Sequence, residues 1–182
     1  MKNYKNFLNE SIADFMVTLV NSDSKTIDGF IETGGDVNLV ADDNSLLMMA
    51  CETGYLNVID KLIDNDKIDV NYKNKYGENA LYIALVNNWL AVTKSLIKSK
   101  KLDINEKVNG ENMIIAIARW SNNENVFTFL RLYPDIDWEE KNSDDEYFFN
   151  HLNDDGIKRL EMDYPEIYSV YKKEKSIKQF NI

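Results

Sequence analysis

The 182-residue chain has little of the residue types that build metal sites and disulfides, with one cysteine, Cys51, and one histidine, His151. A single cysteine cannot close a disulfide within the chain, and the two residues together are too few for a zinc or iron–sulfur site. The longest apolar run, residues 113–118, is far shorter than the roughly 18 residues that a membrane-spanning helix needs. We therefore expect no metal, no cofactor, no membrane span and no disulfide scaffold.

Positive charge is also scarce. The chain has 21 Lys and Arg against 31 Asp and Glu, for a net charge of −10, and residues 135–166 hold twelve acids and only three bases. Phosphate binding needs clustered Lys and Arg, so the composition argues against nucleic acid as a direct ligand. An acidic surface leaves protein partners with a basic surface open.

Motifs for catalysis are missing as well. His151 is the one side chain that could act as an imidazole base, but no G-x-S-x-G elbow or comparable nucleophile accompanies it, so we interpret it as a packed or surface residue. The paired acids fall where turns or helix starts are expected, and there a carboxylate caps backbone N–H groups; these are Asp42-Asp43, Asp144-Asp145 and Asp154-Asp155. Since no nucleotide-binding glycine motif exists either, we predict no enzyme activity and no small-molecule substrate.

An internal repeat sets the expected architecture. Four short strings begin at residues 36, 69, 103 and 135, so their starts are 33, 34 and 32 residues apart. An apolar run with helical spacing precedes each string. A fixed period of this length is typical of a stacked repeat protein, in which one unit cannot bury its apolar face alone. The strings are Asp36-Val37-Asn38, Asp69-Val70-Asn71, Asp103-Ile104-Asn105 and Asp135-Ile136-Asp137.

The repeat resembles that of the ankyrin family, which reads roughly G-x-T-P-L-H-x-A-A-x-x-G-H, an apolar helix and then G-A-D-V-N. Residues 77–84, Gly-Glu-Asn-Ala-Leu-Tyr-Ile-Ala, match its start, and residues 47–55 and 110–114 match in the flanking repeats. The resemblance covers about residues 24–141 and implies an all-α solenoid of paired helices. We expect an N-terminal capping repeat at 11–40, repeats at 41–141 and an acidic helical C-terminal cap at 142–182.

This register makes detailed predictions about packing. Small Ala50 and Ala84 should be buried where inner helices approach closely, Cys51 should be a core residue, and Gly54 should end its helix in a left-handed conformation. The Thr-Pro pair of the family is absent, so the inner helices should lack their usual cap. We also expect an insertion near residues 120–123. The ends should form helices at 11–20, 24–33, 146–152, 157–163 and 166–177.

The first ten residues resemble the capsid-targeting peptide of internal proteins in large tailed bacteriophages, which reads M-K-x-Y-x-x-F-[IL]-x-E. Leu8-Asn9-Glu10 fits the site of the prohead protease, and cleavage after Glu10 would leave Ser11 first. The other interpretation is an amphipathic N-terminal segment with Tyr4, Phe7 and Leu8 on one face. No apolar core of a secretory signal follows, so we expect synthesis in the host cytoplasm.

In ankyrin proteins the turn tips and inner helices form a concave surface that binds a protein partner, and Tyr and Trp commonly anchor interfaces. The register assigns the candidate partner-binding residues to this surface: Met49, Tyr72, Tyr76, Ile83, Val86, Val108, Trp120 and Trp138. We predict a non-enzymatic module of phage or viral origin that occupies a host protein, such as a defence or regulatory factor. The alternatives are a packaged structural protein of the virion interior and an acidic DNA mimic built on the C-terminal segment.

Overall fold

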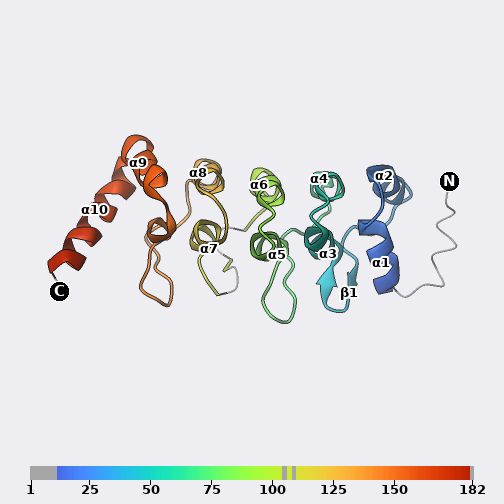
Figure 1. The fold of residues 1–182 in the computed structure, drawn as a ribbon. Coiled ribbons are helices and arrows are strands. Elements are labelled where there is room, and N and C mark those ends of the chain that lie inside the picture. Colours follow the sequence, from blue (N-terminus) through green and yellow to red (C-terminus); the bar gives the residue numbers. More distant parts are fainter. Residues whose placement is uncertain (1–11, 104–105, 108–109, 181–182) are drawn as a thin grey trace.

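The structure, a computed structural model, describes residues 12–103, 106–107 and 110–180, and these form a single row of helix pairs (Figure 1). The inner helices are α1 (Ile12–Val20), α3 (Leu46–Thr53), α5 (Ala80–Val86) and α7 (Met113–Trp120). The outer helices are α2 (Ser24–Glu32), α4 (Leu56–Asp64), α6 (Leu90–Lys98) and α8 (Asn123–Leu132). The row ends in the 3-10 helix η2 (Phe148–His151), α9 (Asp154–Asp163) and α10 (Pro165–Phe180). The predicted all-α solenoid is confirmed.

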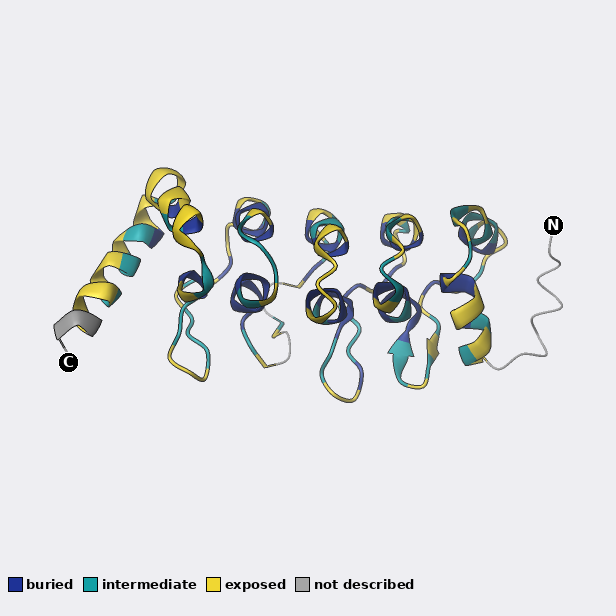
Figure 2. Cartoon of the chain, in the orientation of Figure 1, coloured by how far each residue is buried: buried dark blue, intermediate teal, exposed yellow. Residues whose placement is uncertain are grey.

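One continuous core runs between the inner and outer rows (Figure 2). Apolar side chains at helical spacing face this core, as Val58, Ile59 and Leu62 of α4 do. Ala50 of α3 and Ala84 of α5 are fully buried, and α5 packs against α3 on one side and against α7 on the other. Because each pair contacts mainly its neighbours, stability is spread along the row, and the predicted burial of both alanines is confirmed.

Loops that we call fingers precede α3, α5, α7 and η2 (residues 39–45, 72–79, 106–107 with 110–112, and 138–147), and they extend beyond the inner row in Figure 1. In the first finger, β1 (Val40–Ala41) pairs antiparallel with β2 (Asn44–Ser45). Its turn residues Asp42 and Asp43 both have positive φ, as a two-residue hairpin turn requires. Positive φ recurs at Gly77, Gly110 and Asp145 in the later fingers, so Asp145 takes a backbone conformation that glycine adopts more easily.

The Asp-x-Asn strings link each repeat to the next through backbone hydrogen bonds. The Asp69 carboxylate accepts from the backbone N–H of Asn71 at 2.9 Å, and this bond fixes the turn. The Asn71 side-chain amide donates to the Lys101 carbonyl at 2.8 Å and accepts from the Asp103 N–H at 2.9 Å. Asn38 makes the same pair of bonds one repeat earlier. The NH₂ and C=O groups of each side-chain amide are therefore both hydrogen-bonded to the backbone of the next repeat. The sequence did not reveal this link between repeats.

The inner helices lack the family's Thr-Pro cap, as expected, but other residues cap them: Ser45, Asn79 and Asn112 each accept a backbone N–H in the first turn of the following helix. One local prediction is wrong. No insertion lies near residues 120–123: α3 and α4 begin at 46 and 56, α5 and α6 at 80 and 90, and α7 and α8 at 113 and 123. The third repeat thus keeps the register of the other two.

The ends follow the prediction with one correction. Helices α1, α2, α9 and α10 occupy the expected segments, but residues 146–147 are part of a finger rather than of a helix. Glu146 cannot enter a helix there because its backbone carbonyl and N–H are bonded by Asn142, at 3.0 and 2.9 Å. No helix among the described residues is long and apolar enough to cross a membrane. The predicted targeting peptide and its Glu10 cleavage site lie outside the described residues.

Candidate partner-binding surface

The fingers and the inner helices α3, α5 and α7 together form the surface on which the partner-binding residues were predicted, and we call it the inner surface. Three of those residues present substantial apolar area to solvent. Tyr76 at a finger tip is 69% exposed, Trp120 at the end of α7 is 47% exposed, and Val86 at the end of α5 is 43% exposed. The Lys75 ammonium lies 5.0 Å from the Tyr76 ring centroid and partly covers one ring face.

The other described candidates are less accessible. Ile83 is buried, which corrects its assignment as a contact residue: its side chain contributes to the core rather than to the surface. Met49, Tyr72 and Trp138 are half-buried against that core, and the Tyr72 hydroxyl donates to the Asp43 carbonyl of the preceding finger at 3.4 Å. Val108 lies outside the described residues. The accessible part of the predicted site is therefore Tyr76, Val86 and Trp120.

Two carboxylates of the inner surface, Glu52 of α3 and Glu78 of the second finger, lie near each other. Partial desolvation raises the pKa of Glu52, and the nearby charge of Glu78 raises this pKa further. The Asn74 amide donates to the Glu78 carboxylate at 2.8 Å. Among the ion pairs of the described residues, none involves Glu52 or Glu78. Two neighbouring carboxylates without a cation favour a positively charged group on whatever binds here.

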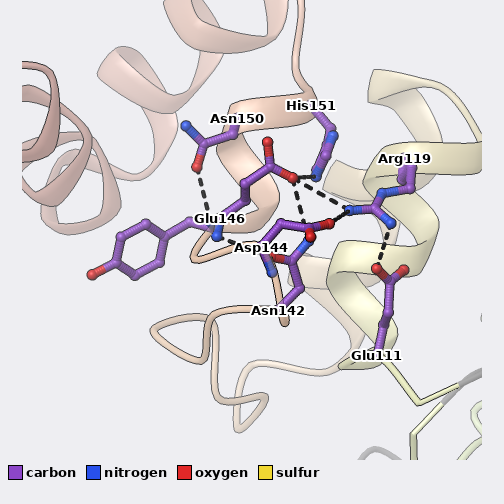
Figure 3. A network of polar contacts seen from close by, with 8 residues as sticks. Glu111, Arg119, Asn142, Asp144, Glu146, Asn150 and His151 are labelled. Carbon is purple, nitrogen blue, oxygen red and sulfur yellow. Dashed lines mark hydrogen bonds and ion pairs between the residues drawn. The ribbon is translucent and has the colours of Figure 1, made fainter. Parts of the chain in front are cut away.

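A polar network at the C-terminal end of the inner surface places one cation, Arg119, among three carboxylates (Figure 3). Arg119 of α7 lies 2.6 Å from the Glu111 carboxylate, 3.3 Å from that of Glu146 and 3.6 Å from that of Asp144. Hydrogen bonds from Asn142 and the nearby charges of His151 and Arg119 hold the pKa of Glu146 below its usual value. The network joins α7 to the last finger, so it connects the third repeat with the C-terminal cap.

His151 lies at the edge of this network and not in a catalytic arrangement. Its Nε2 is 3.4 Å from the Glu146 carboxylate but makes no hydrogen bond with it. Burial lowers the pKa of the imidazole, and the Glu146 charge opposes that shift only in part. The ring is thus a neutral, packed residue at neutral pH, which agrees with the interpretation from sequence.

The remaining chemical candidates are also structural. Cys51 is fully buried, and burial strongly raises the pKa of its thiol, so the nucleophilic thiolate is suppressed. Over the part of the chain that the structure describes, no three His, Cys, Asp or Glu side chains are placed to hold a metal ion. The acid pairs lie at turns and at the start of α9, as expected.

The acidic segment 135–166 presents less unpaired charge than its composition suggests. Six of its twelve acids form ion pairs with lysine or arginine, and these are Glu140, Asp144, Asp145, Glu146, Asp155 and Asp163. A continuous row of unscreened carboxylates, which a DNA mimic would need, is therefore interrupted by cations.

Exposed apolar residues also occur where the sequence reasoning did not place them. Tyr55 is 52% exposed, Trp89 is 40% exposed and Leu90 is 37% exposed, and all three lie at the connections between inner and outer helices. The sequence does carry a signal for two of them: Tyr55 and Trp89 are aromatic residues at the same position of two successive repeats, directly before the outer helix. The register had assigned contact roles only to finger tips and inner helices, so these residues were missed.

Comparisons with known proteins agree with this architecture. Residues 15–108 and 47–142 each match the family described as ankyrin repeats in three copies. Alpha-latrocrustotoxin-Lt1a of Latrodectus tredecimguttatus is 27% identical over 142 residues, which cover 68% of this chain and 10% of the toxin. The chain thus spans about a tenth of the length of that relative. Because the family matches extend over most of the chain and coincide with the observed helix pairs, the chain belongs to the ankyrin-repeat family.

Proposed function

We propose that the protein is a non-enzymatic binding module of phage or viral origin whose inner surface occupies a host protein, such as a defence or regulatory factor. Ankyrin repeats bind protein partners, and the family model that matches this chain describes such repeats. The observation that carries the proposal is that Tyr76, Val86 and Trp120 of the inner surface are exposed to solvent, whereas most other large apolar side chains are buried in the core. Exposed aromatic residues of this kind are typical interface anchors.

Two carboxylates of the inner surface specify the partner further. Glu52 and Glu78 lie close enough for the charge of one to raise the pKa of the other, and neither has a cation of its own. A lysine or arginine from the partner would relieve that repulsion as the two proteins associate. The partner surface therefore combines a basic side chain with apolar groups that contact Tyr76 and Trp120.

Capture from a lysate of the candidate host, followed by affinity measurements with the purified partner, tests this proposal. We expect Tyr76→Ala, Val86→Ala and Trp120→Ala each to weaken the complex at least tenfold, about 1.4 kcal/mol, because interface anchors commonly contribute about 2 kcal/mol or more. Met162→Ala is the matched control, since Met162 is 74% exposed but lies on α9. Circular dichroism should show that all four variants fold.

Two results would contradict the proposal. Unchanged affinity in all three variants would exclude the inner surface as the contact. Loss of binding only on neutralising Asp144, Asp145 and Glu146 would make the C-terminal acidic segment the recognition element, in agreement with electrostatic mimicry instead.

Packaging in the virion interior is the second candidate function. It rests on the match of residues 1–10 to a capsid-targeting peptide. Helix α1 begins at Ile12, so cleavage after Glu10 would remove no residue of the described repeats. Mass spectrometry of purified virions should then detect a peptide that begins at Ser11, and its absence from the virion would refute packaging.

A further inference from the structure

A pocket that we call the arginine pocket lies between the outer helix α8 and the cap helix α9. It measures about 480 Å³, and the residues that line it are Glu124, Phe127, Thr128, Arg131 and Arg159. One wall is a buried ring, because Phe127 is 2% exposed and Tyr164 stacks on it with the ring centroids 5.8 Å apart. None of these residues belongs to the inner surface, so the pocket is a separate candidate for binding.

Arginine is concentrated at this pocket. The chain has eighteen lysines but only three arginines, and two of the three line the pocket. The Arg159 guanidinium lies 4.4 Å from the centroid of the Phe127 ring and forms an ion pair with Asp163 at 3.2 Å. Arg131 is exposed, and within the part of the chain that the structure describes it forms no ion pair and no hydrogen bond. The charge of Arg131 is therefore available to a ligand.

The carboxylate that lines the pocket already has a cation. Glu124 forms an ion pair with Lys94 of the preceding repeat. The hydrogen bond and charge of Lys94, with the nearby charges of Lys98 and Arg159, hold the pKa of Glu124 below its usual value. A cationic ligand would thus find no unpaired carboxylate in the pocket lining, whereas the positive charge of Arg131 is unmatched. The local charge favours an anion, although the chain as a whole is acidic.

A buried hydroxyl supplies a second, independent sign of a ligand. Thr128 lines the pocket with only 6% of its surface exposed, and its hydroxyl makes no hydrogen bond with any residue that the structure describes. A threonine inside a helix commonly bonds the carbonyl three or four residues earlier, and this one does not. Leaving a buried polar group without a partner is unfavourable. An oxygen atom of a bound ligand would accept this hydrogen bond.

We propose that the arginine pocket binds an acidic segment of a partner protein, and that one carboxylate of that segment accepts hydrogen bonds from Arg131 and Thr128 beside Arg159. The planar guanidinium presents paired N–H donors that match the two oxygens of a carboxylate. A phosphate dianion fits less well, because it would bring a second negative charge close to Glu124 and Asp163. The pocket is larger than a carboxylate alone needs, so it has room for the side chain that carries it. This site acts independently of the inner surface.

A short peptide tests the proposal without knowledge of the natural partner. The probe is Gly-Ser-Gly-Glu-Gly-Ser-Gly with blocked termini, and its control has glutamine in place of glutamate. Because the chain has three arginines, the side-chain Nε–H groups give three signals in an NMR titration. The glutamate peptide should shift the signals of Arg131 and Arg159, leave that of Arg119 unchanged, and bind at least about fivefold more tightly than the glutamine peptide. Binding should weaken between about 50 and 500 mM NaCl, since salt screens the charges.

Variants of the protein then locate the site. Arg131→Gln and Thr128→Val should each reduce the affinity for the glutamate peptide to about that for the glutamine peptide, whereas Thr128→Ser keeps the hydroxyl and should bind like the parent. Lys173→Gln is the matched control, because it removes an exposed cation of α10 that forms no ion pair with a described residue. Tyr76→Ala should also bind the peptide like the parent, which separates this pocket from the inner surface. Thermal unfolding confirms that each variant is folded.

Several outcomes would overturn the proposal. These are equal binding of the glutamine peptide, an unchanged affinity in Arg131→Gln, or binding of sodium acetate as tight as that of the peptide, which would make the pocket a site for small anions. Tighter binding of the same peptide with phosphoserine in place of glutamate would assign the pocket to a phosphorylated partner. Sedimentation that shows a concentration-dependent dimer abolished by Arg131→Gln would assign it to an acidic segment of a second copy of the chain.

Discussion

Ala84 lies in α5, between α3 and α7, with none of its surface exposed. A carboxylate at this position would be desolvated with no cation beside it, so we expect Ala84→Asp to lower the free energy of unfolding by about 3 kcal/mol or more. Urea unfolding followed by circular dichroism measures the loss. Ala91→Asp is the control, because Ala91 is exposed in the first turn of α6, where an acid is tolerated. Equal stability of the two variants would show that the repeat register is wrong.

His151 gives the protein a pH dependence of predictable sign. Burial holds its folded pKa below the ordinary value of about 6.5, so the unfolded chain binds the proton more readily. The free energy of unfolding should therefore fall as the pH drops below about 6.5, and the loss should stop once the folded imidazole also titrates.

The variant His151→Gln isolates this effect. Urea titrations at pH 7.5 and 5.5 should show a smaller loss of stability in the variant than in the parent. Glu146 does not interfere in this range, because its lowered pKa confines its contribution to more acidic conditions. The same pH dependence in both proteins would mean that His151 does not set it.

At the scale of elements, the hydrogen bonds of Asn71 hold two strings of adjacent repeats together. Asn71→Asp keeps an acceptor for the Asp103 N–H but loses the donor to the Lys101 carbonyl. We expect a loss of about 1–3 kcal/mol in the free energy of unfolding, since a polar group then loses its partner. Asn57→Asp is the control because Asn57 is exposed on α4. Indistinguishable urea midpoints would show that the link adds no stability.

The helices were the most predictable elements, and the connections between them the least. A period near 33 residues located the inner and outer helices because apolar residues must recur on the buried face. The caps were not predicted, since asparagine replaces threonine at residues 79 and 112 and performs the same bonding. Residues 120–123 were expected to hold an insertion because Ile117-Ala118 replaces the alanine pair of the family just before them. The polar connection Ser121-Asn122 is as short as Gly54-Tyr55.

The candidate site was predictable only in part, for a physical reason. A repeat register assigns each residue to a helix face, but its exposure depends on how neighbouring repeats pack. Ile83 and Tyr76 were assigned to one surface, yet the first is buried and the second is 69% exposed. Trp89 was missed because its ring occupies space beside Gly54 of the preceding repeat, where any side chain larger than hydrogen would collide with it.

At the scale of the whole molecule, Arg119 fastens the C-terminal cap to the repeats. Replacing it with methionine leaves the carboxylates of Glu111 and Glu146 close together without their cation. We expect a cost of about 1–3 kcal/mol, confined to the end of the array because repeats contact only their neighbours. Hydrogen exchange should become faster in η2 and α9 and stay unchanged in α1–α4.

Lys98→Met is the matched control, since it removes an exposed cation from α6 without breaking an ion pair of the described residues. Uniformly faster exchange along the whole row in Arg119→Met would contradict a local role for the network.

The links between strings have a consequence for how such a chain changes over evolutionary time. Asn38 reaches from its own repeat to the backbone of the next, and Asn71 does the same one period later, to chemically equivalent groups. A duplicated or deleted unit would meet the same donors and acceptors at both of its borders. Gene copies of such a unit can therefore lengthen the array without new side chains, while an insertion of a few residues within a unit would misplace the amide at that unit's border.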